Sequence, residues 1–387
     1  MTFISDNKSL REFCEKVSTS SDYITVDTEF IRERTYWSEL CLIQIGGKEC
    51  AAAIDTMAPG IDLAPVFNLM LNNSVTKVFH AARQDFEIFS QLMGKLPTPV
   101  FDTQISAMVC GYGDSIGYDA LVKSLTKERI DKSMRYTDWR RRPLSKKQLE
   151  YALSDVTHLR VVYEKLRETL AENGRADWVA EEMETLTNNA TYYPDPMEAW
   201  RRLKIRSTKP RFLLILREVA AWREIEAQRR NVPRNRVVRD EGLLEIAAQA
   251  PKDEIALRAL RGMRNEKLRG KPLKALLKAI RQGQELPENY CPIVPHRPNK
   301  VSNMEGAREL IRVLLKYCSE KNGVAQKLIS TSEEIEMVIS NPDSKPRPLT
   351  GWRGELFGQF AVSVLQGELA LTASGSDIKL VKPGEEI

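Results

Sequence analysis

The N-terminal region of the chain contains the segment Tyr23-Ile24-Thr25-Val26-Asp27-Thr28-Glu29-Phe30. Its β-branched and aromatic residues predict a β-strand. Asp27 and Glu29 then project from the same face, because alternate side chains of a strand share a face. Burying two neighbouring carboxylates is costly, and each raises the pKa of the other. A divalent cation, which takes oxygen ligands, would offset this charge. A solvated acidic pair on an edge strand is the alternative for this motif alone.

Length and composition indicate a folded protein of two or three domains. The chain has 387 residues, of which 42% are hydrophobic and 29% are charged. The first ten residues are polar, without the apolar core of a secretory signal, and no apolar run approaches the ~18 residues of a membrane span. Six scattered cysteines and three histidines argue against a disulfide framework or a zinc site. We therefore expect a cytoplasmic protein that does not associate with membranes.

Charge is distributed unevenly along the chain. Residues 1–200 contain 23 Lys and Arg against 30 Asp and Glu, whereas residues 201–300 contain 25 against 11. Residues 301–387 are nearly balanced, with 10 against 12. This asymmetry predicts a middle segment that grips a polyanion beside an acidic N-terminal half that holds metal. A solvated helical surface is the alternative for the basic segment.

The N-terminal half has the pattern of an α/β domain with an antiparallel start. The Gly46-Gly47 turn predicts a hairpin between strands at 40–45 and 50–55. A capping box of Ser145 and Gln148 begins the longest helix of this half. The remaining elements that we expect are strands at 23–30, 76–80 and 100–102, and helices at 10–17, 62–71, 85–93 and 103–109.

The C-terminal half is expected to be helical. Residues 188–200 and the proline-rich residues 286–298 are predicted linkers. They separate helical segments at 211–263 and 305–372, whose similar size suggests a duplicated small module. The tail from Ser374 to Ile387 is expected to be loose.

Four acidic residues are candidates for a catalytic metal centre. Four carboxylates placed together can hold two divalent cations about 3.5–4 Å apart. One cation activates a water and the other stabilises the leaving 3′ oxygen during attack on a phosphodiester. Tyr151 lies one helical turn before Asp155 and is suited to orient this water, because a phenol pKa near ~10 makes it a poor base. The four acids are Asp27, Glu29, Asp85 and Asp155.

These residues resemble the DEDD 3′→5′ exonucleases. The matching motifs are V-D-T-E-F at 26–30, H-x4-D at His80–Asp85 and Y-x3-D at Tyr151–Asp155, and the tyrosine is typical of the DEDDy branch. Gln84 departs from the pattern, since many relatives have an aromatic residue there. The closer resemblance is to the ribonuclease D family, through Phe101-Asp102-Thr103, Thr137-Asp138-Trp139 and Arg142-Pro143-Leu144-Ser145. The helical segments resemble HRDC domains, which are found at the C-termini of helicases and ribonuclease D.

The resemblance implies an architecture and an activity. It implies an α/β RNase H-like exonuclease domain at 1–195, with a mixed sheet flanked by helices, and two all-α HRDC-like domains at 196–290 and 300–380. It also implies a metal-dependent 3′→5′ exoribonuclease with two Mg²⁺ or Mn²⁺ ions on the four acids. Such an enzyme would trim tRNA precursors and other structured RNA 3′ ends and release nucleoside 5′-monophosphates. We expect a monomer whose basic first HRDC domain binds RNA.

Six further residues are candidates for substrate contacts. Aromatic side chains stack on bases with little sequence preference, and arginines contact phosphates. Core packing is the alternative for the aromatic residues, internal hydrogen bonding for the histidine, and solvation for the arginines. The six are Phe30, Tyr36, His80, Arg142, Arg223 and Arg230.

Three other functions compete with this interpretation. A 3′→5′ exonuclease acting on DNA would use the same carboxylates. A catalytically silent RNA-binding scaffold would have no use for the complete set of four acids and Tyr151. A helicase accessory subunit draws on the HRDC resemblance alone, and the sequence contains no Walker-type phosphate loop that would make the chain itself a helicase.

Overall fold

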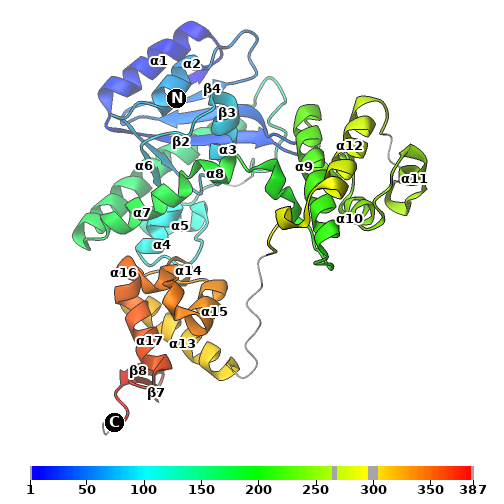
Figure 1. Ribbon diagram of the computed structural model, residues 1–387. Coiled ribbons are helices and arrows are strands. Elements are labelled where there is room, and N and C mark those ends of the chain that lie inside the picture. Colours follow the sequence, from blue (N-terminus) through cyan, green and yellow to red (C-terminus); the bar gives the residue numbers. More distant parts are fainter. Residues whose placement is uncertain (1, 132, 264–267, 295–303, 385–387) are drawn as a thin grey trace.

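A mixed six-stranded sheet forms the centre of the N-terminal domain in this computed structural model, which describes residues 2–131, 133–263, 268–294 and 304–384 (Figure 1). The strand order is β1-β4-β3-β2-β5-β6, in which β3 is antiparallel to both its neighbours and the other pairs are parallel. The predicted mixed sheet with an antiparallel hairpin is therefore confirmed. The strands are β1 Thr2–Ile4, β2 Tyr23–Ile31, β3 Glu39–Gly46, β4 Ala51–Asp55, β5 Thr76–Phe79 and β6 Val100–Asp102.

Helices cover both faces of this sheet. One core joins β2, β3 and β4 to α1 (Asn7–Ser20), α2 (Ala64–Met70) and α3 (Arg83–Met93). On the other face, α6 (Lys146–Glu172) packs its buried stripe against β3 and β4. The predicted capping box begins α6. The other helices of the domain are α4 Thr103–Val109, α5 Tyr118–Thr126, α7 Ala176–Leu186 and α8 Asn189–Tyr192.

A close contact fixes α6 against the central strand β2. The Thr25 hydroxyl donates a hydrogen bond to the backbone carbonyl of Val156, at 2.8 Å, and a weaker one to that of Gly46, at 3.2 Å. A Cβ on Gly46 would lie 2.4 Å from the Thr25 hydroxyl and 3.2 Å from the Val156 carbonyl. Only glycine fits there, so Gly46 permits the close approach of helix and strand.

The region after residue 195 is helical as predicted, with one exception. A first group comprises η1 Pro196–Arg202, α9 Pro210–Arg230, η2 Arg234–Arg236, α10 Asp240–Gln249, α11 Glu254–Ala259, η3 Arg261–Met263, α12 Lys271–Glu285 and η4 Glu288–Tyr290. A second group comprises α13 Glu305–Asn322, α14 Gln326–Ile329, α15 Ser332–Ser340, η5 Pro342–Ser344, η6 Arg347–Leu349, α16 Gly351–Arg353, η7 Gly354–Gly358 and α17 Gln359–Leu365. Among the residues that the structure describes, no helix is long and apolar enough to cross a bilayer.

The exception is the C-terminal end, where the predictions of a helix to residue 372 and a loose tail from Ser374 were wrong. Strands β7 (Ala370–Ser374) and β8 (Asp377–Val381) form an antiparallel hairpin. Gly375 supplies the positive φ of 67° that its two-residue turn requires. Leu371 and Leu380 pair across the hairpin and pack against the core of the second helical group. The alternation of apolar and polar residues in these short strands places both leucines on the same face.

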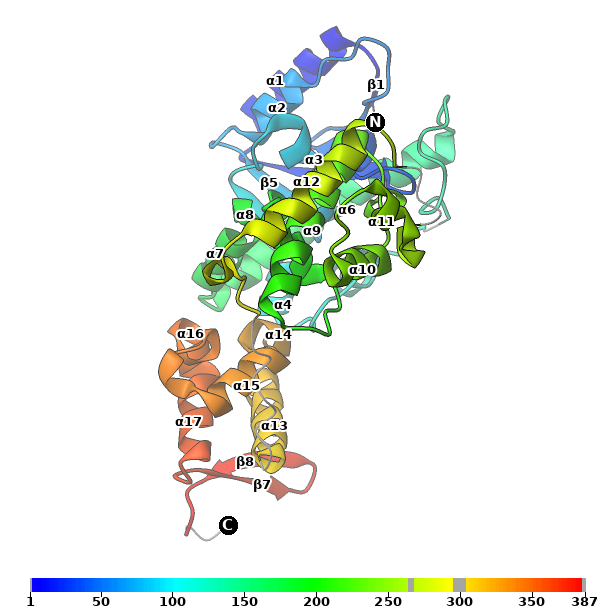
Figure 2. The same ribbon diagram turned by 45° about the vertical axis from the view of Figure 1, so that its right-hand side comes forward.

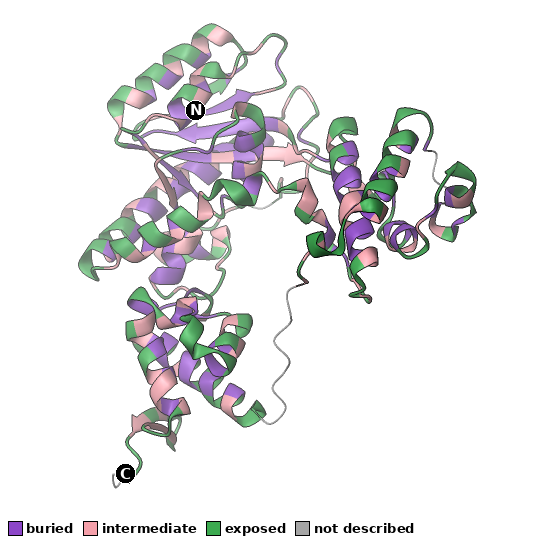
Figure 3. Cartoon of the chain, in the orientation of Figure 1, coloured by how far each residue is buried: buried purple, intermediate pink, exposed green. Residues whose placement is uncertain are grey.

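The second helical group shares its core with the N-terminal domain. Apolar residues of α4, α6 and α7 belong to the same buried cluster as α13–α17. Trp178 of α7 stacks on Trp352, with ring centroids 4.3 Å apart, and Arg353 pairs with Glu181 and Glu182. Figure 3 shows the buried residues of the N-terminal domain and of the second helical group in purple. Figure 2 shows α14 and α16 lying next to the N-terminal domain.

The first helical group docks through the loop that follows β2. Asn231, at the C-terminus of α9, has φ of 49° and accepts hydrogen bonds from the backbone N–H groups of Tyr36 (3.1 Å) and Trp37 (3.0 Å). The Tyr36 phenol is buried and donates to Glu224, which also pairs with Arg234. The loop that continues the central strand is thus fixed to α9.

Substitutions of Asn231 test this joint. Asn231→Gly tolerates the positive φ but removes two hydrogen bonds, so it should cost about 1–2 kcal/mol of stability. Asn231→Ala adds backbone strain of about 1–2 kcal/mol, whereas Asn231→Asp keeps an acceptor oxygen and should stay near wild type. Urea denaturation, monitored by Trp fluorescence, measures the stability of each variant relative to wild type. A glycine variant as stable as wild type would show that the amide does not hold the loop.

Candidate active site

Three of the four predicted carboxylates converge in space. Asp27 and Glu29 come from β2 and Asp155 comes from α6. One carboxylate oxygen from each lies within 4.8 Å of the other two. The alternation of the strand places Asp27 and Glu29 together, and the contact of Thr25 with Val156 brings α6 alongside them. The arrangement is a compact set of oxygen ligands.

Asp85 lies beside this cluster without belonging to it. It sits in the first turn of α3 and is 7% exposed. Its Oδ1 accepts a hydrogen bond of 2.5 Å from the Thr28 hydroxyl. Burial and then the negative charge of Asp27 raise the pKa of Asp85, and the charge of Asp85 contributes to the raised pKa of Glu29. Asp85 is therefore close enough to add its charge to the site.

Burial and mutual repulsion make these carboxyl groups weak acids. Burial raises the pKa of Glu29 to about 10, with further contributions from Asp27, Asp155 and Asp85. Burial and the charge of Asp27 raise the pKa of Asp155 to about 8, and burial raises that of Asp27 to about 6. Without a cation the site would retain protons. A set made only of carboxylate oxygens is suited to hard divalent cations, which would replace those protons.

Tyr151 faces the same site. Tyr151, Asp27 and Asp155 line one cavity of about 240 Å³. Burial and then the charge of Asp155 raise the pKa of Tyr151, so that its phenol stays protonated. A hydrogen bond from Tyr151 in turn lowers the pKa of Asp155. The phenol is thus available as a hydrogen-bond donor but not as a base.

Tyr118 is a cavity residue that sequence reasoning missed. Its hydroxyl donates a hydrogen bond to the backbone carbonyl of Asp155, and its ring lies 5.2 Å from that of His80. His80 Nδ1 lies 3.0 Å from the Thr103 hydroxyl, which donates to the Phe79 carbonyl. His80 therefore donates through Nδ1, and burial lowers its pKa. Tyr118 belongs to no recognisable sequence motif, so its contact with α6 could not be predicted from the sequence.

Three of the candidate substrate residues have partners within the protein. Tyr36 is buried between the domains, as described above. Arg142 forms two hydrogen bonds with the Asp55 carboxylate, of 2.9 and 2.5 Å, and another with the Cys41 carbonyl. Arg223 is 4% exposed and pairs with Asp240 at 2.6 Å. Contact of these side chains with RNA would require those interactions to open.

The other candidates lie elsewhere. His80 lines the active-site cavity. Phe30 is half-buried. The register of β2 against β3 shifts between Glu29 and Phe30. Arg230 is exposed at the C-terminal end of α9. Arg230 is therefore exposed, whereas Tyr36 and Arg223 are buried and Arg142 is half-buried.

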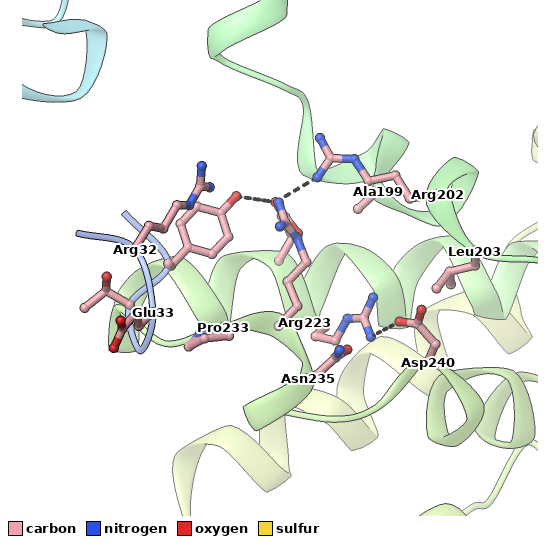
Figure 4. A pocket seen from close by; sticks show the side chains of 13 residues that line it. Arg32, Glu33, Ala199, Arg202, Leu203, Arg223, Pro233, Asn235 and Asp240 are labelled. Carbon is pink, nitrogen blue, oxygen red and sulfur yellow. Dashed lines mark hydrogen bonds and ion pairs between the residues drawn. The ribbon is translucent and has the colours of Figure 1, made fainter. Parts of the chain in front are cut away.

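A second cavity, of about 420 Å³, lies where the first helical group meets the loop after β2 (Figure 4). Its arginines are balanced by carboxylates: Arg32 pairs with Glu87, and Arg223 with Asp240. The buried Glu224 lies within ion-pair distance of the two remaining arginines, Arg202 and Arg234. Because each arginine of the lining has a carboxylate within ion-pair distance, this cavity is better described as an interdomain joint than as an anion site.

Comparison with known protein families divides the chain into two matched parts. The family model described as 3′-5′ exonuclease matches residues 1–171, and the HRDC domain model matches residues 213–280. The first match contains all four candidate carboxylates and Tyr151. The second lies within the first helical group.

Relatives and a solved structure match nearly the whole chain. The chain is 47% identical to ribonuclease D of Granulibacter bethesdensis over 99% of this chain and 97% of the relative, and 46% identical to that of Acidiphilium cryptum over 98% and 96%. It is also similar to the crystal structure of Escherichia coli RNase D, an exoribonuclease involved in structured RNA processing. That match has a TM-score of 0.78 and 31% identity and covers 94% of this chain and 98% of the other.

The raised carboxyl pKa values predict how stability depends on pH. Between the unfolded pKa values near ~4 and the folded values near 8 and 10, the folded metal-free protein binds more protons than the unfolded chain. Stability of the metal-free protein should therefore fall as the pH rises from about 5 to about 9. Thermal unfolding in chelator measures this decline.

Divalent cations should oppose the decline, because they bind the deprotonated site. At 100 times its Kd, a cation that binds only the folded state adds about 2.7 kcal/mol. The gain from Mg²⁺ or Mn²⁺ should be larger near pH ~9 than near pH ~5. Asp155→Asn should reduce both the pH slope and the gain. Equal gains at both pH values would contradict the proton-metal exchange.

Proposed function

The chain belongs to the ribonuclease D family of 3′→5′ exoribonucleases, and we propose that it trims the 3′ extensions of tRNA precursors and other structured RNAs. The observation that carries this proposal is the convergence of Asp27, Glu29 and Asp155 at a cavity beside the buried Asp85. The exonuclease domain of this family is metal-dependent. Two Mg²⁺ or Mn²⁺ ions are proposed here, with Asp27, Glu29, Asp85 and Asp155 as their ligands.

The protein's own groups would position the reactants. The bound ions supply Lewis-acid activation of water and charge stabilisation at the leaving 3′ oxygen. Thr28 holds one oxygen of Asp85 through its hydroxyl. The Tyr118 hydroxyl fixes the backbone of Asp155. These contacts restrict the ligands to one arrangement before substrate arrives, which favours in-line attack on the terminal phosphodiester and release of a nucleoside 5′-monophosphate.

Tyr151 is proposed to hydrogen-bond the attacking water. It is on the same face of α6 as Asp155, one turn earlier, and lines the cavity. Because burial keeps the phenol protonated, it would orient the water and leave proton removal to other groups. Tyr151 would then hold the water in the orientation needed for attack on the phosphodiester.

The helical groups would hold the body of the RNA. We propose HRDC-like domains at 196–290 and 300–380 after an exonuclease domain at 1–195. The excess of basic residues in 201–300 supports phosphate contacts by the first of them, so RNA binding should weaken steeply with salt. We further propose a monomer that works in the cytoplasm, which the six free cysteines support.

A timed digestion tests this function. A 3′-extended tRNA transcript should shorten stepwise from its 3′ end with Mg²⁺ or Mn²⁺ and stop with chelator, whereas a matched single-stranded DNA should be cut more slowly. Asp155→Asn should lower cleavage by at least about 10²-fold, more than removal of an outer-shell group, while RNA binding stays nearly intact. Equal digestion of DNA would indicate a general exonuclease. RNA that is bound but never shortened would indicate a silent scaffold.

Tyr151→Phe tests the role of the phenol separately. It should lower kcat by about 10²-fold, because misplacement of a reacting group by about 1 Å costs on this scale, with little change in RNA affinity or melting temperature. Tyr193→Phe is a matched control, since that phenol bonds the Ser90 carbonyl at 2.7 Å and lies outside the cavity. A Tyr151→Phe enzyme with full kcat would remove Tyr151 from the proposed mechanism.

A further inference from the structure

The segment between α5 and α6 borders the mouth of the active-site cavity. Two of its residues, Ile130 and Arg135, line the same cavity as Asp27, Tyr151 and Asp155. Among the described residues that line this cavity, Arg135 is the only lysine or arginine. A cationic side chain therefore lies beside the carboxylates of Asp27 and Asp155 in this lining.

The guanidinium of Arg135 is accessible, unlike that of Arg142. Arg135 is exposed, and within the part of the chain that the structure describes no carboxylate forms an ion pair with it. Nearby, Arg140 pairs with Asp138, and Arg142 pairs with Asp55. The charge of Arg135 also acts to lower the pKa of Tyr151, which places it within electrostatic reach of the site.

The next residue adds an aromatic surface. Tyr136 is 91% exposed, and the Arg135 guanidinium carbon lies 5.4 Å from its ring centroid. A single exposed aromatic residue needs no explanation by itself. Here, however, the exposed ring adjoins Arg135, a cation in the lining of the cavity. A guanidinium and an aromatic ring side by side offer a phosphate contact and a stacking surface, the two contacts that single-stranded RNA presents.

Helix α6 holds this segment from both sides. Upstream, Glu128 lies 2.9 Å from Nε2 of His158, whose Nδ1 is 2.7 Å from the Ser154 carbonyl. Downstream, the Gln148 amide donates to the Thr137 hydroxyl at 3.1 Å. Because α6 also carries Tyr151 and Asp155, these anchors tie the position of Arg135 and Tyr136 to the catalytic residues.

We propose that Arg135 and Tyr136 form an RNA-contact site at the mouth of the active-site cavity. The Arg135 guanidinium holds a phosphate near the 3′ end of the strand, where it offsets the repulsion between that phosphate and the carboxylates. The Tyr136 ring stacks on a base of the same strand. This inference rests on the proposed exonuclease function and adds to it the residues that receive the single-stranded 3′ end.

Binding measurements can test the site apart from catalysis. Fluorescence anisotropy would follow a labelled single-stranded oligoribonucleotide on the Asp155→Asn protein with Mg²⁺ present. Added Arg135→Ala should weaken binding about 10-fold and reduce the salt slope by about one, as expected for one lost phosphate contact. Arg135→Lys should restore part of the affinity. Tyr136→Ala should also weaken binding about 10-fold, whereas Tyr136→Phe should not.

Arg129→Ala is the matched control, because Arg129 is an exposed arginine of the same segment that does not line the cavity. It should leave binding unchanged. If Arg135→Ala and Tyr136→Ala bind as tightly as their parent, or if Arg129→Ala weakens binding equally, the proposed site is overturned. Failure of the wild-type chain to shorten RNA would instead reject the exonuclease function, so the two failures are distinguishable.

Discussion

The structure depends on how it accommodates negative charge in a buried place. Asp27, Glu29, Asp85 and Asp155 lie at the junction of a sheet and two helices, where burial raises the pKa of each and repulsion raises the pKa of Glu29, Asp85 and Asp155 further. The surrounding fold must hold this arrangement against its own electrostatic cost. The hydrogen bond of Thr25 to the Val156 carbonyl, together with the absence of a side chain on Gly46, holds α6 against β2 at this point. The buried carboxylates lower the stability of the metal-free protein, and the same negative charge gives the site its affinity for cations.

Local patterns predicted the parts of this site that depend on local geometry. Strand alternation placed Asp27 and Glu29 on one face, and the capping box of Ser145 and Gln148 marked the start of α6. Asp155 lies 128 positions beyond Asp27 in the sequence, and only the resemblance to a family linked the two before the structure did. Tyr118 was missed because its contact with the Asp155 carbonyl arises from tertiary packing. The hairpin at 370–381 was missed because its short apolar alternation was taken for the end of a helix.

Charge counting predicted the basic character of residues 201–300 but not which cations are available. Arg223 and Arg234 are directed inward and pair with Asp240 and Glu224, so part of the positive charge serves the interdomain joint. Tyr36, predicted to stack on RNA, likewise closes that joint. Net charge counts every arginine equally, whereas a guanidinium that already has a carboxylate partner contributes little to holding a polyanion. Burial and pairing in the folded chain must be known before a basic segment is assigned to binding.

The shared core of α4, α7 and the C-terminal helices has a consequence for how the chain matures. Met108, Val109, Val179 and Met183 are buried together with residues of α13–α17, which follow much later in the sequence. During synthesis at about 5–20 residues per second, roughly 10–40 s separate the emergence of α7 from that of α17. Until α13 and the helices after it emerge, the apolar face that they cover, including Trp178, lacks its partners. The C-terminal helices thus complete the solubility of a domain that is translated long before them.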